Sequence, residues 1–196
     1  MKYEAIVIGV SAGGMSALST ILSCLPDDFA LPIIVVQHMD PNSRDYLPDH
    51  LDRKCSMQVK EAEDKENIIN GVAYIAPPNY HLLLEEDRTF SLSVDDAVNY
   101  SRPSIDVMFE TAVDVYKEKL VGVILTGANA DGSKGLTKIK AMGGLAVVQD
   151  PATAHVDYMP KAAIASTKVD HILPLEEISS LLMELSNSSR ADELKP

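Results

Sequence analysis

A short stretch near the start of the chain has the residue types and spacing of a nucleophile turn. Gly9-Val10-Ser11-Ala12-Gly13 fits the pattern G-x-S-x-G, in which small residues flank a serine between a strand and a helix. In that arrangement the hydroxyl projects outward, and nearby backbone N–H groups can receive an oxyanion. The alternative is structural, because a serine at this point can also cap the helix that follows.

The same glycines could instead hold a phosphate. The dinucleotide fingerprint G-x-G-x-x-G would use positions 9, 11 and 14, but position 11 is a serine, whose side chain obstructs the approach of a pyrophosphate to the backbone. The next expected strand ends in Val36-Gln37-His38, with no carboxylate for the ribose. Dinucleotide binding is therefore the weakest of the alternatives.

A serine nucleophile needs a base, and the base needs an orienting carboxylate. His38 follows the second expected strand, and Asp131 lies in a loop of small residues after the strand expected over Val121–Leu125. Taken singly, each has a structural alternative, a core histidine or a helix cap. The carboxyl ends of parallel strands meet at one edge of a sheet, so the three residues together predict a Ser-His-Asp hydrolase site. Their order differs from that of α/β-hydrolases, in which the acid precedes the histidine.

The elements that must position these residues alternate between strands and helices. Several strands are continuous Val/Ile/Leu runs, typical of strands buried on both faces. The expected strands are Ala5–Ile8, Ile33–Gln37, Gln58–Glu61, Val72–Ala76, Leu82–Glu85, Thr89–Val94, Val121–Leu125, Leu145–Val148 and His171–Leu173. The expected helices are Met15–Leu25, Ser43–Arg53, Ser104–Tyr116, Ser133–Met142, Pro160–Ala165 and Leu175–Leu185.

These elements predict one three-layer α/β/α domain, a doubly wound and mostly parallel sheet with an antiparallel hairpin. The hairpin is expected to turn between Leu82–Glu85 and Thr89–Val94. We expect the domain to span residues 1–186 and the polar residues 187–196 to form a flexible tail.

Composition limits the possible partners and the compartment. The 196-residue chain has a formal net charge of −12, which argues against binding to nucleic acid or to an anionic membrane surface. No stretch reads as a membrane span or a signal peptide. Cys24 and Cys55 are too few for a disulfide framework, so we expect reduced thiols and a cytoplasmic protein. Metal-ligand spacing is absent from the remaining histidines, which we interpret as surface or strand-end residues: His50, His81, His155 and His171.

Seven separated motifs resemble the catalytic domain of the chemotaxis protein-glutamate methylesterases, the CheB family. They cover nearly the whole chain from Ile6 to about Leu185, in the order "IGVSAGG", "VVQHM", "YIAPPNYHLLL", "RPSIDVMF", "GVILTGANADGSKGL", "GGLAVVQDPATAHVDYMPKAAI" and "ILPLEEI". The resemblance implies hydrolysis of γ-glutamyl methyl esters on the cytoplasmic helices of chemoreceptors, with release of methanol. In some members it also implies deamidation of receptor glutamines.

The resemblance also implies the roles of individual residues. The nucleophile, base and acid of the family fall on Ser11, His38 and Asp131, and no metal or organic cofactor is implied. We expect the backbone N–H of Ala12 to serve as oxyanion donor, and Ala128 to offer a further backbone N–H.

The chain also departs from the family pattern. Ala12 stands where the family usually has threonine, and Ala128-Asn129 replaces a Met-Gly pair, so a hydroxyl near the nucleophile and a bulky wall of the site are lost. The motifs begin at the first strand, so we expect a stand-alone domain without the usual receiver domain, either constitutively open or controlled by a separate protein. Two alternatives stay open: an esterase or amidase acting on another substrate, and a non-catalytic signalling or binding module with the same fold.

Overall fold

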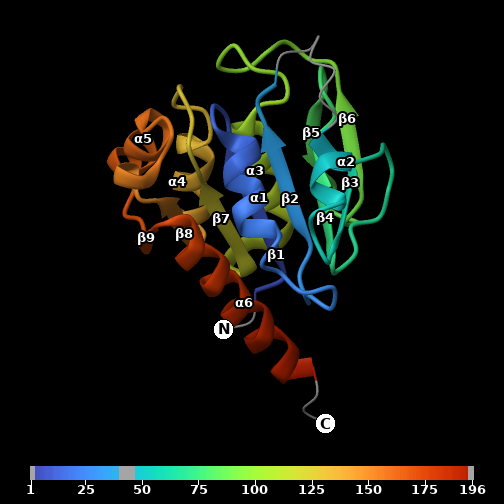
Figure 1. The fold of residues 1–196 in the computed structure, drawn as a ribbon. Helices are drawn as coiled ribbons and strands as arrows, with labels where there is room; N and C mark the ends of the chain where they lie inside the picture. The colour runs from blue at the N-terminus through green and yellow to red at the C-terminus, as the bar shows by residue number, and fades with distance from the viewer. Residues whose placement is uncertain (1–2, 40–46, 194–196) are drawn as a thin grey trace.

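A seven-stranded, fully parallel sheet forms the centre of the computed structural model, which describes residues 3–39 and 47–193 (Figure 1). The strands lie in the order β3-β4-β2-β1-β7-β8-β9. Their bounds are β1 (Ala5–Val10), β2 (Ile33–Gln37), β3 (Gln58–Glu61), β4 (Val72–Ile75), β7 (Leu120–Ile124), β8 (Leu145–Gln149) and β9 (His171–Leu173). Every residue of β1, β2 and β7 is buried, as the uninterrupted apolar runs predict.

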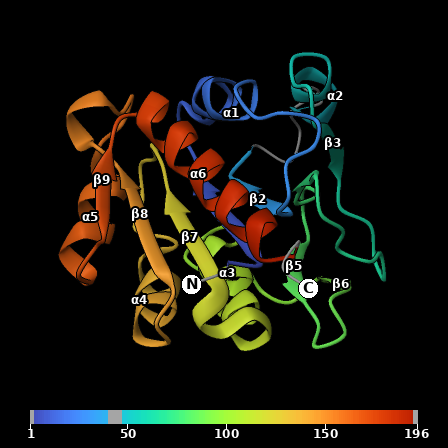
Figure 2. The ribbon, with the colours of Figure 1, turned by 90° about the horizontal axis from the view of Figure 1, so that it is seen from below.

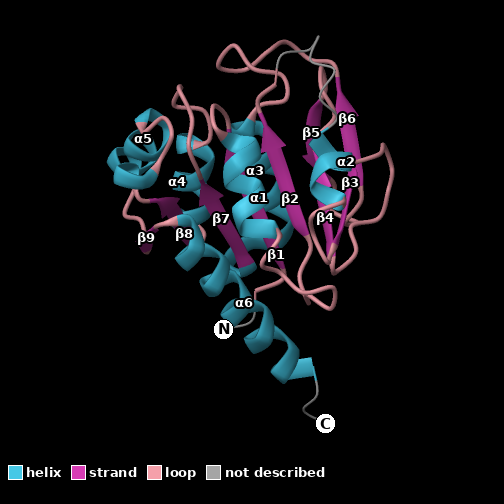
Figure 3. Cartoon of the chain, viewed as in Figure 1, coloured by secondary structure: helices cyan, strands magenta, loops and turns pink. Residues whose placement is uncertain are grey.

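Strand β1 lies at the centre of the sheet, where the order of the strands reverses. Ile8 of β1 is aligned with Val35 of β2 on one side and with Val123 of β7 on the other. The chain first builds the β2-β4-β3 side and then returns to build the β7-β8-β9 side. The loops that follow β1, β2 and β7 therefore lie together at the carboxyl edge, the upper edge in Figure 3, where open α/β sheets bind ligands.

Helices cover both faces of the sheet. Figure 2 shows α1 and α2 on one side and α3 and α4 on the other. One apolar core joins the sheet to α1, α2 and α6, and a second joins it to α3, α4, α5 and a hairpin. The bounds are α1 (Gly14–Leu22), α2 (Leu47–Asp52), α3 (Ile105–Tyr116), α4 (Ser133–Ala141), α5 (Tyr158–Ser166) and α6 (Leu175–Glu193), with short 3-10 turns η1 (Lys117–Lys119) and η2 (Pro151–Thr153). The predicted three-layer α/β/α architecture is confirmed.

The predicted hairpin is formed by β5 (His81–Leu84) and β6 (Phe90–Ser93), which pair antiparallel as a separate two-stranded sheet. It packs on the main sheet through Phe90, whose ring meets that of Tyr74 in β4 edge-on, with centroids 4.9 Å apart. Each end of the two strands differs by one residue from the expected bounds: β5 begins and ends one residue earlier, and β6 is one residue shorter at both ends.

The C-terminal helix differs from the sequence expectation. Helix α6 continues to Glu193, past Leu185, where the apolar pattern ends, and into the segment expected to be a tail from residue 187. Serines hold this part of the helix: Ser186 Oγ accepts the Ala30 N–H at 2.8 Å, and Ser189 Oγ donates to the Tyr3 carbonyl at 2.9 Å. Hydrogen bonds rather than apolar contacts fix it, so hydrophobic periodicity did not reveal it. Of the helix expected over Ser43–Arg53, the structure describes residues 47 onward, which form α2, and residues 43–46 lie outside the described residues.

Candidate functional site

Ser11 lies in the sharp turn between β1 and α1. The turn depends on Gly13, which has φ +81° and whose added Cβ would lie 2.6 Å from the Cβ of His155. The Ser11 N–H donates to the Thr126 carbonyl at 3.0 Å, so this turn is tied to the loop after β7. Gly13 is the N-cap of α1, and no side chain caps the helix. The alternative in which Ser11 caps α1 is therefore wrong.

Gln37 joins the two strand ends that carry Ser11 and His38. Its Nε2 donates to the Ser11 carbonyl at 2.9 Å and to the His38 carbonyl at 2.7 Å, and the side chain is buried. The His38 N–H also donates to the Val10 carbonyl at 3.0 Å. Sequence reasoning missed this role of Gln37, because a glutamine at the end of an apolar run gives no sign of its partners.

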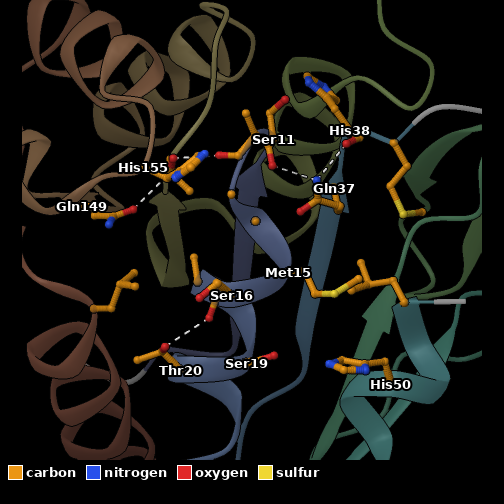
Figure 4. A pocket seen from close by; sticks show the side chains of 18 of the residues that line it. Ser11, Met15, Ser16, Ser19, Thr20, Gln37, His38, His50, Gln149 and His155 are labelled. Carbon is orange, nitrogen blue, oxygen red and sulfur yellow. Dashed lines mark hydrogen bonds between the residues drawn. The ribbon is translucent and has the colours of Figure 1, made fainter. Parts of the chain in front are cut away.

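His38 and Asp131 are in direct contact, as expected from their strand ends. His38 Nε2 lies 2.9 Å from Asp131 Oδ2. In Figure 4 the Ser11 hydroxyl and the His38 ring point toward the same end of a pocket that both residues line. The described side chains of Ser11 and His38 are not hydrogen-bonded to each other, an arrangement common in ligand-free sites.

The Asp131 carboxylate is completely buried and accepts four hydrogen bonds besides that of His38. The N–H groups of Ile105 and Asp106, the first two residues of α3, donate to it at 2.7 and 3.2 Å. The Ser104 hydroxyl and the Asn99 side-chain amide each donate at 2.9 Å. A full set of donors fixes the position of this carboxylate and keeps it ionised.

Asp131 thus caps a helix, but not the one that the sequence suggests. Helix α4, which follows it, starts after Gly132, which has φ +92°, and has no side-chain cap. The carboxylate instead lies at the N-terminus of α3, a distant element in the sequence, so the alternative of a local cap is wrong. Asn99 and the start of α3 were missed as partners, because no local spacing links them to Asp131.

The surroundings shift the pKa values of two neighbouring carboxyls in opposite directions. Burial raises the pKa of Asp131, but hydrogen bonds from His38, Asn99 and the Ile105 N–H outweigh it, so the net pKa is lowered. Burial raises the pKa of Asp106 and the charge of Asp131 adds to the rise, although the Gly135 N–H and Asn99 oppose it. Asn99 Nδ2 bridges the pair, at 2.9 Å from Asp131 Oδ1 and 3.0 Å from Asp106 Oδ2.

His81 is linked to Asp131 through Ser104. It is a strand-end residue, as expected, because it begins β5, but it is buried and so is not a surface residue. Its Nδ1 accepts the Ser104 N–H at 3.2 Å, and since a backbone N–H can only donate, the ring proton is on Nε2, which donates to the Asp96 carbonyl at 3.1 Å. His81 thereby holds Ser104, whose hydroxyl contacts Asp131.

Ser11 and His38 line a cavity of about 870 Å³ that runs along α1 toward α2. Figure 4 shows His155 near the turn that carries Ser11, and Met15, Ser19 and His50 farther along the pocket. None of the lining residues that the structure describes is Asp or Glu, whereas one is a lysine, Lys54. In a chain with 29 acidic residues this lining is unusually free of negative charge.

The two alanines named as backbone donors differ in position. Ala12 lines the cavity, and its N–H has no acceptor among the residues that the structure describes. Ala128 is exposed and is not among the lining residues. The geometry therefore favours Ala12 as the group that faces a bound substrate.

Other expectations concern metals, thiols and membranes. Within the described part of the chain, no three His, Cys, Asp or Glu side chains are grouped so that they could hold a metal ion. Cys24 and Cys55 are free thiols. None of the helices described here combines the length and the apolar character that crossing a bilayer requires.

Comparison with known proteins shows the family to which the chain is similar. The CheB methylesterase family model matches residues 6–182. A relative from Leptospira interrogans is 57% identical over 96% of this chain and 98% of its own length. A protein-glutamate methylesterase/protein-glutamine glutaminase of Thermotoga maritima is 41% identical over 92% of the chain, which spans 53% of that longer protein.

A solved structure has the same fold. The crystal structure of the Thermotoga maritima CheB methylesterase catalytic domain superimposes with a TM-score of 0.90 and 40% sequence identity. The match covers 94% of this chain and all of that domain. At this identity the likeness extends beyond the order of the strands to much of the sequence.

Proposed function

The chain belongs to the CheB methylesterase family, and we propose that it is a serine hydrolase that removes methyl esters from γ-glutamyl residues of chemoreceptors. Its place of action is the cytoplasm, where the receptor helices would present these esters. The observation that carries the proposal is the 2.9 Å contact of His38 with Asp131 at the sheet edge that also holds Ser11. Family membership alone would not distinguish a working hydrolase from a binding module.

The proposed reaction has two steps. Ser11 Oγ attacks the ester carbonyl while His38 Nδ1 takes its proton, because Nε2 is engaged by Asp131. His38 then returns the proton to the departing methoxide, which leaves as methanol and gives a glutamyl ester of Ser11. Water, deprotonated by the same nitrogen, cleaves this ester and releases the glutamate carboxylate. The ring nitrogens thus exchange the roles they have in chymotrypsin-like proteases.

The charges that develop in these steps have partners in the site. Asp131 stays ionised, since its pKa is lowered, and stabilises the imidazolium that forms on His38. The N–H of Ala12, beside the start of α1, would donate to the oxyanion, and the helix dipole adds to it. One such donor typically lowers the barrier by about 3 kcal/mol.

The cavity supports a substrate with negative charge near the ester. A receptor segment with several glutamyl sites bears a carboxylate wherever an ester has already been removed. Lys54 and His50 lie on the same cavity as Ser11, and no described lining residue would repel such a segment. Lys54 is exposed and has no ion pair with a described residue, so it is available to a substrate carboxylate.

The same chemistry would deamidate glutamine, with ammonia in place of methanol as leaving group. A glutaminase activity is part of the name of the Thermotoga maritima relative. The acyl-enzyme intermediate is identical in both reactions, so Ser11, His38 and Asp131 would serve both.

A fluorophosphonate probe tests the nucleophile without knowledge of the receptor. We expect the probe to label Ser11, and Ser11→Ala to lose labelling by orders of magnitude. Ser16→Ala is the matched control, because Ser16 lines the same cavity and should label as the wild type does. A folded wild type that resists the probe, or that is labelled elsewhere, would contradict the proposal and favour the binding module.

A further inference from the structure

Asn129 contacts both the acid and the base of the proposed site. It lies half-buried in the loop between β7 and α4. Its Oδ1 accepts the Asp131 N–H at 3.1 Å, and its Nδ2 lies 3.4 Å from His38 Nδ1. The second contact involves the nitrogen that the proposed reaction uses as the base.

The Asp131 N–H fixes which end of the amide faces His38. A backbone N–H can only donate, so the side-chain atom beside it must be the Asn129 oxygen, and the NH₂ group must face the ring. An NH₂ group is also only a donor, so Nδ1 must present its lone pair. The ring proton is then on Nε2, which donates to Asp131 Oδ2.

The contact between Asn129 and His38 both favours and hinders the proposed proton transfer. It holds His38 in the tautomer that can accept a proton from Ser11, but it covers the lone pair that Ser11 must reach. Once Nδ1 is protonated, two donors face each other across the same contact. At 3.4 Å the contact is long for a hydrogen bond, so a substrate-bound Ser11 can displace it.

We propose that Asn129 is a positioning residue that holds neutral His38 with its proton on Nε2 and turns away when Ser11 transfers its proton. This inference rests on the proposed role of His38 as the base. Among the described groups, Asp131 faces Nε2 directly, and Asp106 lies behind it, bridged by Asn99. The other titratable or charged groups on the shared cavity are His50, Lys54 and His155.

Two variants separate the contact with His38 from the contact with the loop. Asn129→Gly removes both. Asn129→Asp keeps an oxygen for the Asp131 N–H and replaces only the donor that faces Nδ1, so it is the matched control for the structural role. The readout is the rate of Ser11 phosphonylation by a fluorophosphonate from pH 5 to 9, together with thermal stability.

For Asn129→Gly we expect the plateau rate to rise roughly threefold or more, because the lone pair of Nδ1 is then open to Ser11. For Asn129→Asp we expect the rate to change at a nearly unchanged melting temperature, because only the donor that faces Nδ1 is lost. Rates that fall only in step with the melting temperature in both variants would show a purely structural role and overturn the inference.

The ¹⁵N resonances of the His38 ring provide a readout that does not need a reactive serine. We expect them to show the proton on Nε2 in the wild type near pH 8, and a shifted Nδ1 resonance in both variants, because the hydrogen bond from Asn129 is lost. A proton on Nδ1 in the wild type, or an unchanged Nδ1 resonance in both variants, would refute the inference. If the resonances behave as expected while Ser11 is not labelled, the proposed hydrolase function fails, and only the hold of Asn129 on the His38 tautomer stands.

Discussion

The Asp131 carboxylate accepts the Ile105 N–H at 2.7 Å, although the two residues lie 26 positions apart. This contact places the acid of the proposed triad at the N-terminus of α3, where the helix dipole stabilises a negative charge. The same carboxylate therefore serves two purposes: it completes the helix start, and it orients His38 from the opposite side. Loss of its charge should affect both folding and chemistry.

Because Asp131 orients His38 in the proposed reaction, we expect Asp131→Asn to lower kcat by roughly 10²- to 10⁴-fold. The amide would leave the His38 tautomer undefined and could not stabilise an imidazolium. The rate of Ser11 phosphonylation measures this loss. Asp114→Asn, which changes an exposed carboxylate paired with Lys138, should react like the wild type. An Asp131→Asn enzyme with normal rates would exclude Asp131 as the orienting acid.

Because Asp131 also binds the N-terminus of α3, we expect its contribution to the stability of the folded protein to be lost at low pH. Because the pKa of Asp131 is lowered in the folded protein, its contribution is complete above the ordinary value near 3.8 and is lost as the pH falls through the lowered value. Asp131→Asn should therefore lower the free energy of unfolding by about 2–4 kcal/mol at pH 7. The difference from the wild type should shrink as the pH drops below about 4.

Urea unfolding of both proteins between pH 3 and 8 measures this difference. The pKa of Asp106 is raised, so its effect on stability changes with pH in the opposite direction to that of Asp131. The pH dependence of wild-type stability alone therefore does not isolate Asp131. A difference that stays constant down to pH 3 would show that the Asp131 charge does not contribute to stability.

A third prediction concerns the tie between the strand ends of Ser11 and His38. A Cβ added at Gly14 would collide with Gln37 Oε1, and Gln37 is the residue whose amide holds both carbonyls. Gly14→Ala should therefore displace Gln37, cost about 1–3 kcal/mol of stability, and slow labelling of Ser11. Ser16→Ala on the same helix should do neither. Normal labelling in a destabilised Gly14→Ala protein would show that Gln37 does not position the nucleophile.

A fourth prediction concerns the substrate side of the cavity. Lys54→Glu should raise KM for an acidic receptor segment roughly two- to fivefold, with little change in kcat, because an exposed charge contributes modestly. The effect should shrink at high salt. Arg53→Glu is the control, since Arg53 carries the same charge but is not a lining residue. Equal effects of both substitutions would indicate a general charge effect and no contact at Lys54.

The sequence predicted most of the strands and helices, the contact of His38 with Asp131, and the place of Ser11 at the same edge of the sheet. These follow from apolar runs and from where parallel strands end. It did not predict Asn99, Gln37 or Asn129 as their partners. These three act through side-chain amides whose partners are distant in the sequence or belong to another strand end. Such bonds leave no periodic or spaced pattern, and only the folded geometry reveals them.

The C-terminal part of α6 is another feature that the sequence pattern did not predict. Ser186 and Ser189 bond to backbone groups of the N-terminal half, so a polar segment that resembles a tail is instead part of α6. The apolar pattern ends at Leu185 because the remaining contacts are hydrogen bonds. Element boundaries held by polar contacts are therefore where sequence reasoning is weakest.

The most direct test of the central claim is methanol release from a methylated chemoreceptor cytoplasmic fragment, measured for the wild type and for Ser11→Ala. We expect release by the wild type and a loss of several orders of magnitude in Ser11→Ala. Release that persists in Ser11→Ala would contradict Ser11 as the nucleophile. No release by a folded wild type that labels with fluorophosphonate would contradict the receptor methyl ester as its substrate.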